Sequence, residues 1–314
     1  MTLRSIVEQY TTFRKTLGQR FQVNAQVLNA FCRAIGEGAT PEDVSPEKVS
    51  VFLAGTGRLT ASWHVKHNAL LGFYRYAISR GFTASSPLPK VIPKRPPAFQ
   101  PYIYSQAELL RLLDSTAYYQ RIRGLLDPFM VRTLLLLMYG AALRTSEALS
   151  LTLADVDFTG GVLTVRDSKF FKSRLVPLGP RTVQALVDYA SRRNACGHPQ
   201  DSNAPFFIGR NGKRISIFTL DGSFQKLRKH AGLHRQGGPR CQPRLHDLRH
   251  TSAVHRLTSW YRAGKDVQKL LPQLSVYMGH TYLAATQVYL TMTPELLHEA
   301  SLRFEFYATP GGRP

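Results

Sequence analysis

The feature that most restricts the fold of this chain is a proline-rich segment near the end of its first third. Residues 85–101 read SSPLPKVIPKRPPAFQP, with six prolines and three basic residues. Because proline has no backbone N–H and blocks helix formation, this composition predicts an extended basic linker. The sequence therefore predicts two domains, over residues 1–84 and 105–314, joined by a linker over residues 85–104.

The first domain is predicted to be helical, because its apolar positions recur at spacings of three and four residues. One helix is framed by Ser45 as its N-cap and by Gly55 at its end. The last helix, over residues 61–79, mixes basic and aromatic side chains, which suits contact with phosphates and packing in a groove. The alternative is that its apolar residues form a core stripe and its basic residues a solvated face. The mixed residues are Trp63, Lys66, His67, Tyr74, Arg75 and Arg80.

The second domain is predicted to be mostly helical with one small sheet. Ser105 and Glu108 have the spacing of a capping box and predict the first helix start. A long apolar helix follows and is predicted to end near Gly140. Two β-rich runs, residues 162–165 and 175–178, flank a charged turn and predict a hairpin. The predicted fold class is therefore mainly α: a helical domain followed by an α-rich domain with a small antiparallel β-sheet.

Composition indicates the kind of partner. The chain has 41 Lys and Arg against 20 Asp and Glu, a formal charge of +21, and residues 1–90 alone carry 11 basic and 5 acidic side chains. This excess in both domains favours a polyanion, with nucleic acid first. Neither a run of 18 apolar residues nor a secretory signal is present, which predicts a cytoplasmic protein without a membrane segment. The three cysteines form no Cys-x-x-Cys pair, so we expect reduced packing residues rather than zinc ligands or disulfides.

Two arginines are the first candidates for an active site. Cleaving a phosphodiester builds negative charge on the nonbridging oxygens, and fixed cations stabilise that charge. Arg144 lies in a junction between two predicted helices, which could hold its guanidinium toward a phosphate. Arg249 lies three residues after His246, so the two side chains share one helical face. The alternative for Arg144 is a buried structural pair with Glu147.

The remaining candidates are a lysine, a histidine and a tyrosine. Lys169 lies in the turn of the predicted hairpin, from which a lysine could donate a proton to a leaving oxygen. His280 follows a glycine at a predicted helix end, and Tyr289 comes nine residues later. His250 and His255, in the same segment as His246, are predicted to be packing or surface residues.

A family resemblance gives this set its meaning. In order and spacing over residues 105–300, five segments resemble the motifs of the tyrosine recombinases, the phage integrase and Xer class. The segments are AALRTSEALSLTLADVDF, SKFFKSRLVPL, LHDLRH, LLPQLSVYMGH and TQVYL. The resemblance implies a helical core-binding domain followed by a catalytic domain, which together form a C-shaped clamp around duplex DNA.

The resemblance also implies the role of each candidate. Tyr289 would be the nucleophile that forms a 3′-phosphotyrosyl intermediate and frees a 5′-hydroxyl. Arg144 and Arg249 would clamp the phosphate, and His280 would donate to it. His246 would assist proton transfer with the tyrosine. Lys169 would be the general acid, and Lys172 is the alternative because the turn carries two phenylalanines where many relatives have small or polar residues.

The resemblance further implies partners and a biological setting. The substrate would be double-stranded DNA, and the protein would act as a homotetramer on two DNA sites. The segment PELLHEASLRFEF, with Leu296, Leu297, Ala300 and Phe304 on one side, would dock on a neighbouring protomer or pack on its own domain. The covalent intermediate conserves bond energy, so no cofactor or metal is implied. The region around Tyr289 is more similar to recombinases carried by mobile elements.

Three other functions stay open from the sequence. A type IB topoisomerase would use the same chemistry to relax supercoils without pairing sites. A noncatalytic DNA-binding regulator could use the same fold. A metal-dependent nuclease or transposase would need clustered carboxylates, and Asp155, Asp157 and Asp167 lack a convincing partner Glu.

Overall fold

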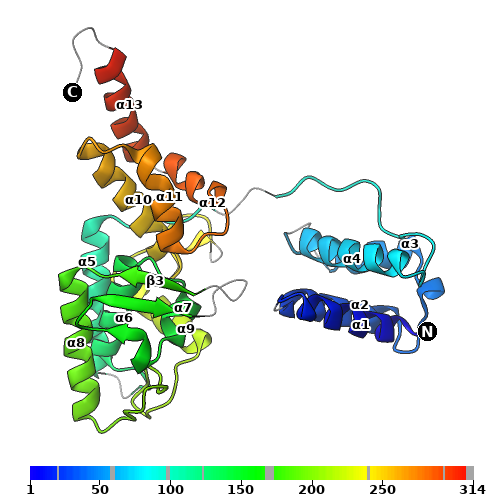
Figure 1. The fold of residues 1–314 in the computed structure, drawn as a ribbon, viewed down its shortest axis with the longest axis horizontal. Coiled ribbons are helices and arrows are strands. Elements are labelled where there is room, and N and C mark those ends of the chain that lie inside the picture. Colours follow the sequence, from blue (N-terminus) through cyan, green and yellow to red (C-terminus); the bar gives the residue numbers. More distant parts are fainter. Residues whose placement is uncertain are drawn as a thin grey trace. The chain divides into compact units, whose positions relative to one another are not determined.

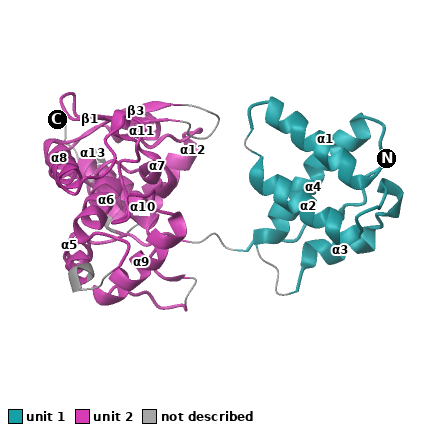
Figure 2. Ribbon diagram, turned by 90° about the horizontal axis from the view of Figure 1, so that it is seen from below, with its two compact units in different colours: residues 1–99 teal, residues 100–314 magenta. Residues whose placement is uncertain are grey.

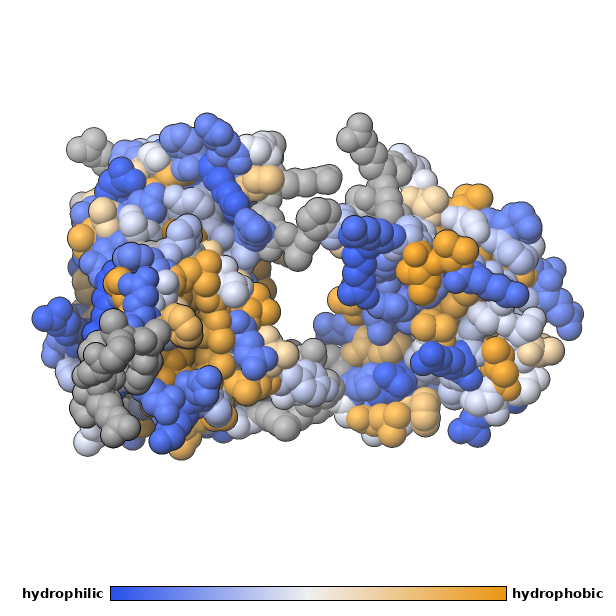
Figure 3. Space-filling view, turned by 90° about the horizontal axis from the view of Figure 1, so that it is seen from above, coloured by the Kyte–Doolittle hydropathy of each residue, from blue (hydrophilic) through white to orange (hydrophobic). Residues whose placement is uncertain are grey.

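The computed structural model describes residues 1–19, 21–56, 61–96, 100–121, 124–166, 173–238, 241–292 and 294–308. The chain divides into two compact units, residues 1–99 and 100–314, coloured separately in Figure 2. On the face shown in Figure 3, both units carry hydrophilic and hydrophobic side chains. No helix of the described residues is long and apolar enough to cross a membrane.

Unit 1 is a bundle of helices around an aromatic and aliphatic core. Its α-helices are α1 (Leu3–Thr16), α2 (Gln22–Ile35), α3 (Pro46–Ala54) and α4 (Ala61–Ser79), with a short 3₁₀ helix η1 (Pro41–Asp43) before α3. The predicted frame of α3 is confirmed, because the Ser45 hydroxyl accepts a hydrogen bond from Lys48 N and Gly55 ends the helix with φ of 64°.

Helix α4 corrects one sequence-based interpretation. Trp63, His67 and Tyr74 are buried in the core, and the Trp63 ring stacks on His67 with a centroid distance of 5.1 Å. For these three residues the core-packing alternative is right and the phosphate-contact interpretation is wrong, because α4 turns this face toward α1 and α2. Of the basic residues, Arg75 and Arg80 are exposed.

Unit 2 is mainly helical with one small sheet, as predicted (Figure 1). The sheet has the order β1-β2-β3 and consists of β1 (Val156–Asp157), β2 (Val162–Val165) and β3 (Arg174–Pro177). Strands β2 and β3 pair antiparallel, with Val162 opposite Pro177 and Val165 opposite Arg174, which confirms the hairpin. The turn of this hairpin, residues 167–172, lies outside the described residues, and both Lys169 and Lys172 are in it.

Helix α6 is central to the larger apolar core of unit 2, and most of its apolar side chains are buried. The unit contains α5 (Gln106–Asp114), η2 (Ser115–Arg121), α6 (Pro128–Gly140), α7 (Thr145–Ser150), η3 (Leu153–Asp155), α8 (Pro180–Ala195), α9 (Ile217–His230), α10 (Asp247–Arg262), α11 (Val267–Met278), α12 (Ala284–Gln287), η5 (Val288–Thr291) and α13 (Pro294–Ala308). Helix α6 packs against α8 and α10 and ends at Gly140, as predicted. The predicted capping box of α5 is present, with Ser105 N donating to Glu108 and Glu108 N to Ser105.

A second apolar cluster of unit 2 lies under α10, α11, η5 and α13 and includes Tyr289. In α13, Leu296 is fully buried and Glu299 pairs with Arg262 of α10 at 2.7 Å. Leu297 and Phe304 are 47% and 73% exposed, so they do not share a buried side with Leu296 in this chain. The first turns of α13 therefore pack on their own unit.

The cysteines differ in their surroundings. Cys32 is buried in unit 1, Cys241 is half-buried and Cys196 is exposed at the end of α8. The prediction that all three are packing residues is therefore wrong for Cys196, because the last turn of an amphipathic helix brings it to the surface.

Candidate active site

The junction between α6 and α7 holds the first predicted arginine. After α6, Ala142 adopts the left-handed conformation with φ of 50°, and Arg144 becomes the N-cap residue of α7. Its guanidinium donates to Glu147 Oε1 at 2.6 Å and to the Gly279 carbonyl at 3.0 Å. The side chain nevertheless remains 31% exposed, so a ligand can still reach it.

Glu147 is the anionic centre of the site. Its carboxylate is 7% exposed and also receives both terminal nitrogens of Arg174, at 3.0 and 2.9 Å. Burial alone would raise the pKa of this carboxyl, but the hydrogen bonds and charges of Arg174 and Arg144 outweigh it and lower the pKa to about 2. The predicted alternative for Arg144, a pair with Glu147, is thus present, and it fixes the guanidinium without covering it.

Arg249 is the second arginine and is almost completely buried, at 1% exposure. Its Nη1 donates to the Ala142 carbonyl and its Nη2 to the Met278 carbonyl at 2.6 Å. Burial and the nearby Arg144 lower the pKa of Arg249 to about 10. Arg249 therefore connects the ends of α6 and α11, which are far apart in the sequence.

The end of α11 sets the position of His280. Gly279 ends the helix in the left-handed region, with φ of 69°, and a Cβ at this position would lie 2.6 Å from Arg174 Nη1. The His280 Nδ1 is then 2.7 Å from the Thr286 hydroxyl, and its ring lies nearly parallel to that of Tyr289 with centroids 6.1 Å apart. Burial, followed by Arg249 and Arg144, lowers the pKa of His280 to about 4.

Tyr289 lies in η5 with only 3% of its surface exposed. Its hydroxyl is 3.0 Å from Nδ1 of His250. Burial raises the pKa of the phenol, and the charges of Arg249 and Arg144 partly offset that rise. The phenol is therefore protonated at neutral pH, within a site that carries positive charge.

His250 is the residue that sequence reasoning missed. The sequence predicted a packing or surface residue, and the ring does pack on Tyr289 at 5.6 Å, but it also shares a hydrogen bond with the Tyr289 hydroxyl. His246, directly before α10, meets the ring of His250 nearly edge-on at 4.9 Å. The spacing of four residues between these histidines puts them on one helical face and could have revealed His250.

The structure thus gathers Arg144, His246, Arg249, His280 and Tyr289 around one point, while Lys169 lies outside the described residues. This site combines a protonated phenol, neutral imidazoles and two anchored guanidinium groups. It can therefore accept an anion and present an oxygen nucleophile to it.

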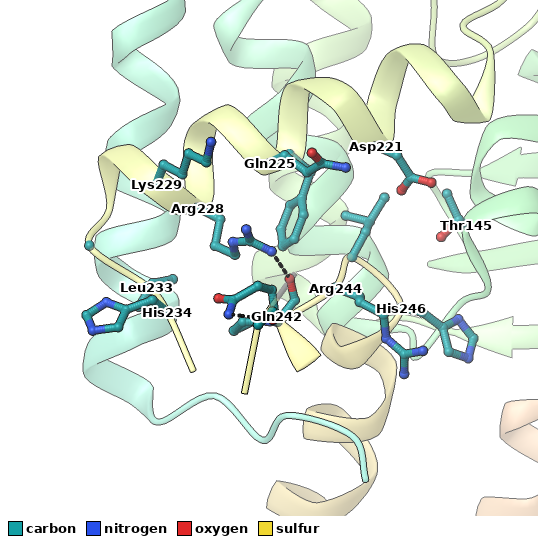
Figure 4. A pocket seen from close by; sticks show the side chains of 15 residues that line it. Thr145, Asp221, Gln225, Arg228, Lys229, Leu233, His234, Gln242, Arg244 and His246 are labelled. Carbon is teal, nitrogen blue, oxygen red and sulfur yellow. Dashed lines mark hydrogen bonds between the residues drawn. The ribbon is translucent and has the colours of Figure 1, made fainter. Parts of the chain in front are cut away.

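A cleft of about 1020 Å³ lies beside this site and is lined by α9, by the segment between α9 and α10, and by Thr145 of α7. Figure 4 shows Thr145 and His246 at one side of the cleft and Lys229 and His234 farther along it. The remaining lining residues named in the figure are Asp221, Gln225, Arg228, Leu233, Gln242 and Arg244. The cleft is thus continuous with the site and is rich in basic and amide side chains.

The carboxylates of the sheet region have structural partners. Asp155 accepts from Arg166 and from the Thr152 backbone, and Asp157 accepts from Gly160 N. Asp167 lies outside the described residues. Among the residues that the structure describes, no three His, Cys, Asp or Glu side chains are grouped as metal ligands would be.

The chain is similar to known proteins in sequence and in fold. The sequence model of the phage integrase family matches residues 105–295. A putative integrase/recombinase of Sinorhizobium fredii, y4rB, is 35% identical over 97% of this chain and 97% of its own length. The tyrosine recombinase XerC of Chlamydia caviae is 30% identical over 74% of this chain and 69% of its own. A lambda integrase tetramer bound to a Holliday junction shares the fold, with a TM-score of 0.66 and 18% identity over 92% of this chain and 77% of that one.

Proposed function

The chain belongs to the phage integrase family of tyrosine recombinases, and we propose that it cuts and rejoins DNA at specific sites through a covalent 3′-phosphotyrosyl bond to Tyr289. The observation that carries this proposal is the position of the Tyr289 hydroxyl among two imidazoles and two anchored arginines. A phosphate bound there would neutralise the arginines and lie within reach of the phenol oxygen.

The roles follow from where charge develops. Arg144 keeps part of its fork exposed and would bind the nonbridging oxygens, with Arg249 behind it. His280 would add a third donor to the same oxygens. His246 would assist proton transfer at the tyrosine. Lys169 would protonate the 5′-oxygen as it leaves, with Lys172 as the alternative, and attack by another 5′-hydroxyl would reverse the reaction.

The proposed substrate is duplex DNA held by both units, with residues 1–84 as the core-binding domain, 85–104 as the linker and 105–314 as the catalytic domain. The net charge of +21 supports binding along a phosphate backbone. The basic cleft beside His246 would line the path of the duplex. Because its substrate is cellular DNA, the protein would act in the cytoplasm.

We propose a homotetramer that pairs two DNA sites. Supporting this, the lambda integrase structure with the same fold is a tetramer on a Holliday junction. The exposed Leu302 and Phe304 of α13 would dock on a neighbouring protomer. The segment around Tyr289 resembles that of recombinases carried by mobile elements, and we propose this setting for the chain.

Covalent capture tests the proposal and identifies the DNA site in one experiment. A pool of duplexes with randomised cores is nicked next to candidate phosphates, so that a short leaving strand diffuses away and cleavage cannot reverse. We expect protein–DNA adducts that survive denaturation by SDS, and sequencing of their DNA would give the preferred site.

The nucleophile is tested in the same pool. Tyr289→Phe should bind the selected DNA and form no adduct, because it lacks the attacking oxygen. Tyr139→Phe is the matched control, since Tyr139 also has a histidine Nδ1 near its hydroxyl, at 2.9 Å. Adducts that persist in Tyr289→Phe would contradict the assignment.

Three further assays separate the alternatives. Activity unchanged by EDTA would argue against a metal-dependent nuclease. Supercoil relaxation on a plasmid without the selected site would favour a topoisomerase, whereas products from two selected sites would favour a recombinase. Binding of the selected DNA without any adduct would favour a noncatalytic regulator.

A further inference from the structure

The hydroxyl of Tyr289 shares a hydrogen bond with a residue to which the family motifs assign no role. Nδ1 of His250 lies 3.0 Å from the Tyr289 hydroxyl, and the two ring centroids are 5.6 Å apart. His246, which would assist proton transfer at this tyrosine, has its ring centroid 4.9 Å from that of His250 and would act through it. Among the described residues, His250 is therefore the imidazole in direct contact with the reacting oxygen.

We propose that His250 is a catalytic residue that accepts the proton of Tyr289 during cleavage. The Oη–H bond breaks and its proton moves to His250 Nδ1. The freed electron pair on Oη forms the bond to phosphorus, the bond from phosphorus to the 5′-oxygen breaks, and that oxygen takes a proton from the general acid. In the reverse attack His250 returns its proton to the phenol. This inference rests on the proposed function.

The surroundings of His250 prepare it for this step. Besides Tyr289 of η5 and His280 after α11, the ionisable groups that act on it come from α10 and the residues just before it: Arg244, His246, Asp247 and Arg249. Burial, then His246, lowers the pKa of His250 to about 4, so the ring is neutral at pH 7. In the tautomer with its proton on Nε2, Nδ1 accepts the hydrogen bond from the phenol.

Bound DNA would make His250 a better proton acceptor. A scissile phosphate brings negative charge beside Arg249, which offsets the positive charge that disfavours protonation of His250. The affinity of His250 for a proton would therefore rise when substrate is present. Because burial keeps the phenol of Tyr289 protonated in the free protein, the nucleophile would be activated only on DNA.

The chain contains a matched control pair. His255, also on α10, has its Nδ1 2.9 Å from the hydroxyl of Tyr139. The two pairs have the same chemistry and nearly the same distance, but Tyr139 has no part in the proposed reaction. Substitutions at His250 and His255 therefore remove equivalent hydrogen bonds from one helix, and only the first should affect cleavage.

The test uses the full-length chain and the nicked duplex selected by covalent capture. His250→Leu removes the acceptor, and His250→Asn keeps a hydrogen-bonding group near the position of Nδ1 that cannot take up a proton. Both should form adducts about 10²–10⁴-fold more slowly than the unsubstituted chain. DNA affinity and the midpoint of thermal unfolding should stay close to those of His255→Asn, which shows that the variants fold.

The pH dependence of the cleavage rate distinguishes a catalytic role of His250 from a purely structural one, which would leave this dependence unchanged. The rate of adduct formation should fall at acid pH as His250 becomes protonated, and His250→Asn should lose this acid limb. Cleavage at the unsubstituted rate by His250→Asn or His250→Leu would overturn the inference, as would an acid limb retained in His250→Asn. If the unsubstituted chain forms no adduct, the proposed function fails as well; if it does and the His250 variants match it, only this inference fails.

Discussion

Both units pack histidines against aromatic rings, but the contacts differ in kind. In unit 1, His67 stacks flat on Trp63 and both side chains are less than one-tenth exposed, inside an apolar core. In unit 2, His250 and His280 make hydrogen bonds through Nδ1 and lie close to guanidinium groups. Burial of a histidine therefore does not by itself indicate a site, whereas a polar partner together with nearby charge does.

The largest expected effect comes from removing the charge at the centre of unit 2. Glu147→Gln leaves Arg174 and Arg249 buried without their carboxylate, and breaking a buried ionic network costs about 3–5 kcal/mol. We expect urea unfolding of unit 2 to shift by that amount, with adduct formation lost in parallel.

Two controls sharpen this result. Asp157→Asn changes an exposed carboxylate of the same unit and should cost less than about 1 kcal/mol. Trp63→Ala should cost unit 1 about 3–5 kcal/mol by leaving a cavity, with no change in unit 2. Equal stability of Glu147→Gln and the unsubstituted chain would show that the ionic network does not hold the site together.

The second prediction concerns acid. Burial lowers the pKa of His250 and of His280 from 6.5 to about 4 in the folded chain. Between these values the unfolded chain binds more protons than the folded one, so the stability of unit 2 is full above pH 6.5 and falls as pH decreases toward 4. A further loss should follow below pH 4.5, because the pKa of Glu147 is lowered to about 2.

Unfolding of unit 2 measured across this range checks the prediction. His250→Asn should flatten the slope between pH 6.5 and 4, since one of the two histidines no longer titrates. We expect a smaller total effect than for Glu147→Gln because solvent partly screens the half-buried rings. Stability that does not change between these pH values would contradict the electrostatic picture of unit 2.

The parts of the fold that could be predicted are those encoded over a few residues. Ser45 with Gly55, and Ser105 with Glu108, mark helix ends within one segment, and the structure has those ends. The faces of α4 could not be predicted with the same security, because Trp63 and His67 suit either a core or a phosphate surface. Only packing against α1 and α2 decides between the two.

For the site, too, local sequence motifs could be predicted and long-range contacts could not. The motifs brought Arg144, Arg249, His280 and Tyr289 together as a predicted set, and the structure has them adjacent. The contact of His250 with Tyr289 spans 39 residues, and that of Arg174 with Glu147 spans 27. Such contacts depend on how helices pack, which local patterns do not specify. The choice between Lys169 and Lys172 stays a prediction.

The third prediction compares one glycine from each unit, Gly279 at the end of α11 and Gly72 in α4. Gly279→Ala requires a left-handed alanine, which costs about 1–2 kcal/mol, and its Cβ would meet the guanidinium of Arg174, which Glu147 holds in place. Gly72→Ala in α4 gains up to about 1 kcal/mol of helix propensity, which the approach of its Cβ to 2.7 Å from the hydroxyl of the buried Tyr10 would offset.

We therefore expect Gly279→Ala to destabilise unit 2 by about 1–2 kcal/mol and to slow adduct formation, because Arg174 and Glu147 would shift. Gly72→Ala should change the stability of unit 1 by less than about 1 kcal/mol. Thermal unfolding and single-turnover cleavage measure both effects. Unimpaired cleavage by Gly279→Ala would show that the end of α11 does not set the geometry of the site.

The smallest expected effect concerns the exposed side of α4, which is solvated, whereas the side that contains His67 is buried in the core. Arg75 is exposed, so Arg75→Ala should change the stability of unit 1 by less than about 0.5 kcal/mol. If Arg75 contacts a DNA phosphate, its loss should lower the slope of log affinity against log salt by about 0.9. Lys66→Ala is the control, because the Lys66 ammonium donates to the Phe52 carbonyl at 2.6 Å and its loss should affect stability rather than the salt slope. If the salt slope of Arg75→Ala is unchanged, Arg75 does not contact a phosphate, because a solvated charge without a phosphate partner releases no counterion. Any DNA-binding surface of α4 would then consist of other residues.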